Sequence, residues 1–174
     1  MIIKNKDKII THGNSKGREL ALDIIDKAIQ SVNGYQATLK KLQVRDDELF
    51  IENLSYNLSK INNIFVLGAG KASFSIVKAL DEILGEKIKG GVVIVKKGEK
   101  RRLKNIKVIE AGHPIPDEGG LKGVKVLLEM AHEAGEKDLV LCAITGGASA
   151  LMPSPAGNIS LDDKKDLTNE FLKS

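Results

Sequence analysis

The chain has 174 residues, of which 42% are hydrophobic, 3% are aromatic and 29% are charged, with a formal net charge of +4. That length and apolar content are sufficient for one domain with its own hydrophobic core. The basic excess is small and Trp is absent, which argues against a nucleic-acid-binding surface, and no apolar run approaches the ~20 residues of a membrane-spanning helix.

The N-terminal segment is polar and rich in lysine, and we expect residues 1–13 to form a flexible arm. Its charges interrupt the apolar start that a signal peptide would need, so we expect a cytoplasmic protein. Residues 14–174 are expected to form a single domain. This domain opens with apolar residues at spacings of three and four over residues 18–32, which predict an amphipathic helix capped by Asn14 or Ser15.

Strands and helices alternate in the rest of the chain. Residues 35–42 predict a second, shorter helix, whereas residues 44–60 show no clear period. Short apolar segments predict four strands, at residues 64–67, 92–95, 106–111 and 139–144. Strands joined by helical crossovers indicate an α/β fold, with a mostly parallel sheet, helices on both faces and hence three layers.

A long helix is predicted between the third and fourth strands, from about Asp117 to Gly135. The fourth strand carries the single cysteine, Cys142, which we expect to be buried because free cysteine usually behaves as a small hydrophobe. One cysteine permits no disulfide within the chain, in keeping with a reducing compartment. The apolar stripe of the long helix is also expected to be buried, and it comprises Leu121, Val124, Leu127, Leu128 and Ala131.

Three loops are expected to meet in one crevice. Ligands of parallel α/β sheets bind beyond the carboxyl ends of the strands. The loops after Leu67, Ala111 and Ile144 all begin at such ends, and all three are rich in glycine.

The first loop is predicted to bind an anion. Gly68 and Gly70 allow a tight turn, and Lys71 stands near the start of a helix, where free N–H groups and the helix dipole favour negative charge. Ser73 completes a G-x-G-x-x-S pattern that also resembles a dinucleotide-binding loop, but Lys96–Lys97 occupy the place where NAD binding would require an acidic residue. A plain turn with a solvated lysine is the alternative.

The second loop is stiffened by Pro114 and Pro116, so its side chains should be held in fixed directions. His113 and Asp117 are its candidate binding residues. Asp117 could instead serve only as the cap of the long helix, and a lone histidine such as His113 could be structural. Both interpretations remain open from the residues alone.

The third loop is predicted to form an oxyanion or phosphate nest. Gly146 and Gly147 let backbone N–H groups approach a ligand, and Thr145 and Ser149 add hydroxyl groups. A nucleophile elbow is disfavoured because the segment lacks the closing glycine of G-x-S-x-G. The histidines are scattered, so we expect no protein metal site.

The three loops together resemble the glycerate 2-kinase family of the MOFRL type. The motifs are Leu-Gly-Ala-Gly-Lys-Ala-Ser at 67–73, Ala-Gly-His-Pro-Ile-Pro-Asp-Glu-Gly-Gly at 111–120 and Thr-Gly-Gly-Ala-Ser-Ala-Leu at 145–151. Their order and spacing carry the resemblance, which extends from about residue 14 to the end of the chain. The resemblance implies ATP-dependent phosphorylation of D-glycerate to 2-phosphoglycerate, a requirement for Mg2+ and a Rossmann-like first domain. It also brings an older name, hydroxypyruvate reductase, which the missing acidic residue for NAD makes less attractive.

The resemblance also assigns roles to the loops. Lys71 would be the catalytic or substrate-charge residue, with its turn shaped by Gly68, Gly70 and Ser73. His113 and Asp117 would line the crevice. Phosphate or the glycerate carboxylate would bind the third loop, at Thr145, Gly146, Gly147, Ala148 and Ser149. Which loop holds ATP and which holds glycerate stays open.

Two features depart from the family pattern. The family usually has Ser-Gly-Gly-Gly in the third loop, whereas this chain has Thr145 and Ala148, and the Cβ of Ala148 puts phosphate affinity in doubt. Family members also continue well beyond Ser174 into a second domain. We therefore expect the chain to be the N-terminal part of such a kinase, with weak anion binding, little or no turnover and a tendency to form homo-oligomers. The alternative is a non-catalytic Rossmann-like module that binds a nucleotide or a sugar acid.

Overall fold

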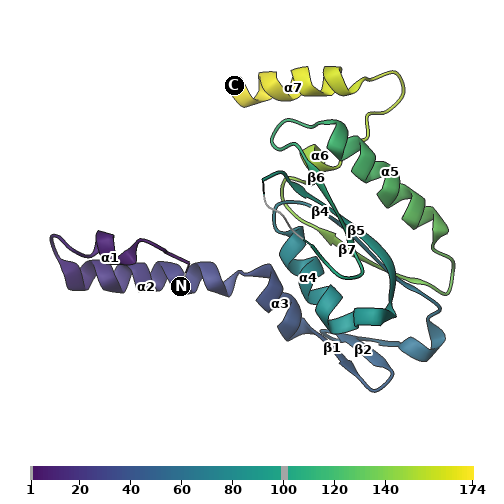
Figure 1. The fold of residues 1–174 in the computed structure, drawn as a ribbon, viewed down its shortest axis with the longest axis horizontal. Helices are drawn as coiled ribbons and strands as arrows, with labels where there is room; N and C mark the ends of the chain where they lie inside the picture. The colour runs from purple at the N-terminus through teal and green to yellow at the C-terminus, as the bar shows by residue number, and fades with distance from the viewer. Residues whose placement is uncertain (1, 99–101) are drawn as a thin grey trace.

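A four-stranded parallel sheet forms the centre of the computed structural model, which describes residues 2–98 and 102–174 (Figure 1). Its strand order is β6-β5-β4-β7. The first strand of this sheet in the sequence, β4, therefore lies inside the sheet, with β5 on one side and β7, the last strand, on the other. This α/β arrangement confirms the predicted fold. The order reverses between β4 and β7, so a crevice for ligands is expected there. The strands are β4 (Ile64–Ala69), β5 (Ile88–Lys96), β6 (Lys107–Ala111) and β7 (Leu139–Ile144).

Two helices cover opposite faces of this sheet (Figure 1). Val93 and Val95 pack into the core cluster beneath α4 (Ser73–Leu84), whereas Ile94 packs into the cluster beneath α5 (Glu118–Glu133). Successive residues of a strand point to opposite faces, which is why the central strand supplies both clusters. β4 is buried along its whole length, as its uninterrupted apolar run predicts.

The long helix begins and ends close to the predicted residues, but its buried face differs from the prediction. Gly120 and Gly123 are its buried residues, and Gly123 lies against Ile94. Val124 and Leu127 are partly buried, as expected, whereas Leu128 is 45% exposed and Ala131 is exposed. The helix approaches the sheet through its glycines, which rotates part of the predicted stripe toward solvent.

The predicted N-terminal helix is present as α2, and it projects away from the sheet (Figure 1). Asn14 caps it by accepting a hydrogen bond from the N–H of Gly17 at 3.0 Å. No residue of α2 is buried, although its apolar positions form the predicted pattern. The N-terminal helices are α1 (Lys6–Ile9), α2 (Ser15–Ser31) and α3 (Gly34–Lys41).

The segment expected to be an arm contains the one-turn helix α1 and contacts α2. Lys6 forms an ion pair with Asp23 at 2.5 Å, and the N–H of Ile2 donates to Asp26 at 2.6 Å. Whether residues 2–13 move independently stays a prediction.

The segment without a clear period forms a small antiparallel sheet. Its turns are Asp46-Asp47 and Glu52-Asn53, and Asp46 and Glu52 adopt positive φ. Neither pair is the Asn-Gly or Asp-Gly that usually marks a two-residue hairpin, so these turns could not be predicted from their residues. The elements are β1 (Leu42–Arg45), β2 (Glu48–Ile51), β3 (Leu54–Asn57) and the 3-10 helix η1 (Leu58–Lys60).

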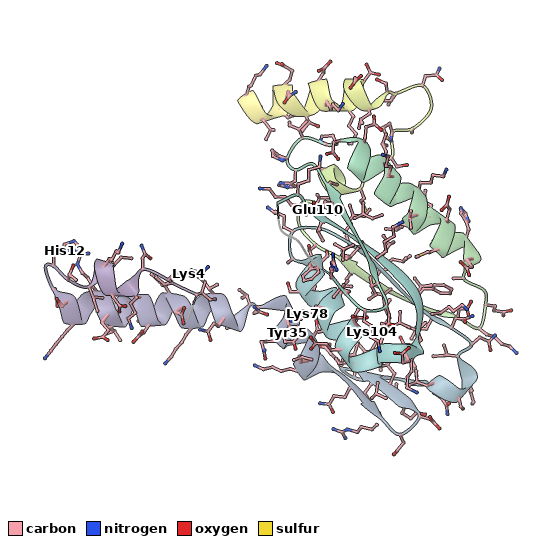
Figure 2. The ribbon with its side chains drawn as sticks, viewed as in Figure 1. Lys4, His12, Tyr35, Lys78, Lys104 and Glu110 are labelled. Carbon is pink, nitrogen blue, oxygen red and sulfur yellow. The ribbon has the colours of Figure 1, made fainter. Side chains whose placement is uncertain are left out.

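Side-chain contacts attach α3 to α4 (Figure 2). The hydroxyl of Tyr35 donates a hydrogen bond to Glu82, and the ammonium of Lys78 lies 5.0 Å from the centre of the Tyr35 ring. The hydrogen bond to the Glu82 carboxylate raises the pKa of Tyr35. At the other end of α4, the buried carboxylate of Asp81 accepts from the backbone N–H groups of residues 104 and 105, which ties the segment before β6 to the helix.

The remaining short elements lie at the two ends of the sheet. A 3-10 turn, η2 (Gly85–Lys87), leads from α4 into β5. After β7 come α6 (Ala148–Leu151) and α7 (Leu161–Lys173), the latter capped by Ser160. In the described parts of the chain, no helix has the length and apolar content to cross a membrane.

The expectation that Cys142 is buried was wrong. β7 is the last strand of the sheet, and α5 covers β5 and β6 rather than β7. Cys142 lies on the face opposite Leu141 and Ala143, which pack beneath α4, and it is exposed. An apolar run therefore did not imply burial on both sides here, because the strand is at the edge.

Candidate functional site

The glycine turn after β4 packs directly against the loop after β7. Gly70 has φ +135°, and a Cβ at this position would lie 2.1 Å from Oγ1 and 2.7 Å from the carbonyl oxygen of Thr145. A side chain at residue 70 is thus excluded both by backbone conformation and by space. The first and third loops meet as predicted from their places at the ends of adjacent strands.

The hydroxyl of Thr145 joins the two loops. Its Oγ1 accepts a hydrogen bond from the N–H of Ala72 at 3.1 Å and lies 3.1 Å from the hydroxyl oxygen of Ser73, which is fully buried. The N–H of Lys71 donates to the carbonyl of Gly146 at 3.0 Å. Two N–H groups that the sequence suggested for anion binding are therefore used by the protein itself, and the exposed side chain of Lys71 is the charge that remains at this turn.

His113 brings the second loop to the same place. Gly147 has φ +90°, and a Cβ there would lie 2.8 Å from Nε2 of His113 and 3.2 Å from Cγ of Lys71. The peptide bond between His113 and Pro114 is cis. We call Lys71, His113 and Gly147 the three-loop junction. It combines a cation, an imidazole and a stretch of backbone that has no side chain of its own, which are groups suited to an anionic ligand.

Asp117 caps α5 and is held by several donors. It accepts a hydrogen bond from the N–H of Gly120 at 3.1 Å and forms an ion pair with Lys97. Burial alone would raise the pKa of Asp117, but Lys97 and the N–H groups of Gly112 and Gly120 outweigh burial and lower it. This geometry matches the capping alternative, and a direct contact of Asp117 with ligand stays a prediction. Lys97 was not singled out as its partner, because nothing in the sequence relates a strand end to a loop twenty residues later.

The charge of Asp117 should make the stability of the protein pH-dependent. The pKa of this carboxyl is lower in the folded chain than its ordinary value of 3.8, so its stabilising effect is present above about pH 4 and is lost as the pH falls through the folded value. Asp117→Asn keeps an oxygen for the cap but removes the charge. We expect the wild type to be more stable than Asp117→Asn by a constant amount from about pH 7 to pH 5, and the difference to shrink below about pH 4.

Urea unfolding of both proteins at each pH measures this difference. Lys97→Ala removes the same ion pair by deleting its cation, and it should reproduce at neutral pH part of the loss of stability seen in Asp117→Asn. If the difference in unfolding free energy between wild type and Asp117→Asn stays constant down to pH 3, the charge of Asp117 does not contribute to stability as described.

Ala148 does not occupy the position where a third glycine would be needed for backbone geometry. Positive φ in this loop occurs at Gly147, which this chain retains. Ala148 is 8% exposed and packs with Ala69 and Leu151 in the core cluster beneath α5. Its N–H donates to the carbonyl of Thr145 at 3.3 Å, so Ala148 acts structurally here, while Ser149 is exposed. Ala148 therefore needs no positive φ, and its effect on phosphate affinity stays a prediction.

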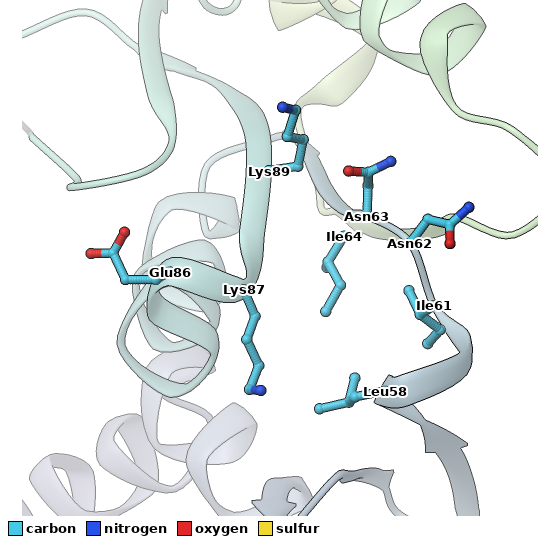
Figure 3. Close-up of a pocket in the computed structure, with 8 residues that line it drawn as sticks. All are labelled: Leu58, Ile61, Asn62, Asn63, Ile64, Glu86, Lys87 and Lys89. Carbon is cyan, nitrogen blue, oxygen red and sulfur yellow. The ribbon is translucent and has the colours of Figure 1, made fainter.

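The described residues contain no group of three or more His, Cys, Asp or Glu side chains that could hold a metal ion. A pocket of about 280 Å³ lies far from the three-loop junction, at the opposite ends of β4 and β5 (Figure 3). Its wall is made by Leu58, Ile61, Asn62, Asn63, Ile64, Glu86, Lys87 and Lys89. Because ligands of such sheets bind at the carboxyl ends of the strands, this pocket is not the expected site.

Comparison with known protein families identifies the chain. The family described as "Domain of unknown function (DUF4147)" matches residues 20–174. The chain belongs to the DUF4147 family. Similar proteins include the glycerate 2-kinase of Pyrococcus horikoshii, 38% identical over 157 residues, and the D-glycerate 2-kinase of Thermotoga maritima, 32% identical over 161 residues. Each alignment covers 90% of this DUF4147 chain but only 35% and 34% of the respective relative.

Solved structures agree with this placement. A crystal structure of a Pyrococcus horikoshii protein matches the DUF4147 chain with a TM-score of 0.78 at 38% identity. The matched region is 90% of the DUF4147 chain and 35% of the Pyrococcus horikoshii protein. The crystal structure of Thermotoga maritima glycerate kinase matches 89% of the chain with a TM-score of 0.69 at 32% identity, over 34% of its length. The DUF4147 chain thus spans about a third of these relatives and corresponds to their N-terminal domain. Further relatives, from Agrobacterium vitis, carry hydroxypyruvate reductase in their names.

Proposed function

We propose that this chain is the N-terminal part of an ATP-dependent glycerate 2-kinase, which converts D-glycerate and ATP into 2-phosphoglycerate and ADP in the cytoplasm. The observation that carries the proposal is the three-loop junction, where Lys71, His113 and Gly147 from three separate loops lie together at the reversal of strand order. The names of the similar proteins support the choice of substrate.

Phosphoryl transfer requires mainly positive charge and accurate positioning around the transferred group. Lys71 provides the charge, and Gly146 and Gly147 let ligand oxygen atoms approach the backbone. The hydroxyl oxygen of glycerate attacks the γ-phosphorus, the bond between that phosphorus and the bridging oxygen of ADP breaks, and the hydroxyl proton passes to a base. His113 is the imidazole of the junction and our candidate for that base.

The remaining predicted site residues have supporting roles in this proposal. Gly68, Gly70 and Ser73 shape the first loop, and Thr145 holds it against the third loop through the contacts to Ala72 and Ser73. Asp117 fixes the start of α5 and thereby the direction of the His113 loop. Ala148 and Ser149 complete the third loop, with Ser149 exposed for contact with ligand.

The requirement for Mg2+ is a separate part of the proposal. The described residues offer no three-ligand cluster, and Asp117 is already engaged by Lys97 and backbone N–H groups. Mg2+ often binds through substrate phosphates with only one or two protein carboxylates. We assign no step of the reaction to a metal held by this chain.

A hydroxypyruvate reductase is the second candidate, favoured by the names of the relatives from Agrobacterium vitis. An NAD-dependent reductase of this fold would need an acidic residue at the end of the second strand of the parallel sheet, to bind the ribose of the cofactor. β5 ends at Lys96, and the next residue, Lys97, is paired with Asp117. This arrangement does not favour NAD. A binding module without catalysis is the third candidate.

One set of measurements separates these candidates. A coupled assay for ADP release with D-glycerate, ATP and Mg2+ tests the kinase, and oxidation of NADH or NADPH with hydroxypyruvate tests the reductase. Calorimetric titration with ATP and with D-glycerate tests binding without turnover. Because the chain spans about a third of its relatives, we expect binding to be easier to detect than turnover. Absence of binding of both ligands at millimolar concentration, or hydroxypyruvate-dependent oxidation of NADH or NADPH, would contradict the proposal.

A further inference from the structure

Lys97 contacts both ends of the loop that carries His113. It directly follows β5, and its backbone N–H donates to the carbonyl of Ala111, where the loop begins, at 3.1 Å. Its ammonium forms an ion pair with the carboxylate of Asp117, where the loop ends and α5 starts. A single residue at the end of a central strand therefore holds the loop at its beginning through the backbone and at its end through the side chain.

The loop between these two contacts has little room to change shape. A Cβ at Gly112 would lie 2.4 Å from a carbonyl oxygen of the same loop and 3.1 Å from Cγ of Asp117. Pro114 and Pro116 fix two φ angles, and Pro116 is fully buried. A displacement at either end is therefore transmitted to His113, because the loop is too tight and too stiff to absorb it.

The imidazole of His113 has a close fit at the three-loop junction. A Cβ on Gly147 would lie 2.8 Å from its Nε2 and 3.2 Å from Cγ of Lys71, so the ring faces bare backbone at short range. A misplacement of about 1 Å in a reacting group can reduce a reaction rate about 100-fold. The position of the His113 loop relative to the sheet is thus important for any chemistry at the junction.

The ion pair with Asp117 is better suited to hold this loop than an ordinary surface pair. Most exposed ion pairs contribute little, because two flexible side chains must both be ordered. Here the side chain of Asp117 is only 24% exposed and is already fixed to α5 by the N–H of Gly120 at 3.1 Å. Only Lys97, whose side chain is 61% exposed, has to be ordered to connect this carboxylate to β5.

We propose that Lys97 is a positioning residue, which acts through Asp117 to hold the His113 loop against β5 and thereby sets the place of the imidazole in the three-loop junction. Lys97 is assigned no contact with a ligand. The importance of this role for a reaction rests on the proposed function, in which His113 is the base. The position of the imidazole itself can be measured without any ligand.

Nuclear magnetic resonance of the histidine side chains in the full chain tests the proposal. His113→Gln identifies the signal of His113 among the three histidines. Lys97→Met keeps the aliphatic stem and removes the ammonium, and we expect it to move or broaden the Cε1–H signal of His113. The signals of His12, at the far end of the N-terminal helices (Figure 2), and of His132, in the last turn of α5, should stay unchanged.

Three further variants show whether the effect belongs to the ion pair. Lys96→Met is the matched control, because it removes the same charge from the neighbouring exposed residue and should leave the His113 signal in place. Lys97→Arg keeps a cation that pairs with carboxylates and should restore the wild-type signal. In an Asp117→Asn background, Lys97→Met should cause no additional change, because residues that act through one contact are not additive. Circular dichroism checks that each variant remains folded.

Calorimetric titration with D-glycerate and with ATP connects this role to the proposed function. We expect Lys97→Met to weaken binding about two- to fivefold, as for the loss of one partly exposed ion pair. Three results would overturn the proposal: an unchanged His113 signal in Lys97→Met, an equal change in Lys96→Met, or a full additional change in the Asp117→Asn background. If the signal moves as expected but the wild type binds neither ligand, the positioning role is supported and the proposed kinase function fails.

Discussion

Replacing Gly70 with alanine is expected to lower the free energy of unfolding by about 2–6 kcal/mol. Two effects add at this position. A non-glycine residue at φ +135° carries backbone strain of about 1–3 kcal/mol. The new Cβ would also lie 2.1 Å from Oγ1 and 2.7 Å from the carbonyl oxygen of Thr145, and relieving such overpacking costs about 1–3 kcal/mol. Because the carbonyl belongs to the backbone, the clash cannot be relieved by a side-chain rotation alone.

Gly146→Ala is the matched control in the facing loop. A Cβ at residue 146 has no heavy atom within 4 Å, and its φ is not positive, so we expect a change within about 0.5 kcal/mol. Urea unfolding followed by circular dichroism measures both variants. Equal stability of Gly70→Ala and Gly146→Ala would show that the two loops do not pack as described.

Replacing Lys71 with alanine is expected to weaken the binding of ATP or D-glycerate roughly 10- to 100-fold, because a hydrogen bond to a charged group contributes about 1.5–3 kcal/mol. Stability should change by no more than about 0.5 kcal/mol, since the Lys71 side chain is exposed. The backbone N–H that donates to Gly146 is retained in the variant. The substitution thus separates ligand binding from folding.

Calorimetric titration of both ligands into wild type and Lys71→Ala measures the effect. Lys87→Ala is the control, because Lys87 is an exposed lysine at the opposite end of the sheet (Figure 3). Equal affinity of wild type and Lys71→Ala would remove Lys71 from the site. An equal loss in Lys87→Ala would show that only net charge matters.

Much of the parallel sheet could be predicted from local pattern. Continuous apolar runs such as 64–67 and 139–144 mark its strands, and Asp117 marks the start of the long helix. The meeting of the loops after β4, β6 and β7 could also be predicted, because parallel strands bring their carboxyl ends to one edge of the sheet. These features depend on periodicity and chain direction, which a sequence displays directly.

The remaining features depend on tertiary packing. Cys142 is exposed because β7 is an edge strand that α5 does not reach, which no apolar run can indicate. The bond from Ala72 to the hydroxyl of Thr145 joins residues 73 positions apart. This hydrogen bond occupies the N–H of Ala72, one of the N–H groups that the glycine-rich motif alone would leave free for a ligand. The turn at Asp46 has no typical hairpin residue.

The isolation of α2 affects how the protein unfolds. None of its 17 residues is buried, so α2 lacks the tertiary packing of an apolar face that supplies most of the stability of helices in proteins. Opening α2 therefore costs far less free energy than opening β4, which is buried throughout. Hydrogen exchange should accordingly show two classes of amides, with α2 exchanging through local fraying and β4 exchanging only when the whole domain unfolds. A global melting temperature would then report on the sheet and leave the N-terminal helix unmeasured.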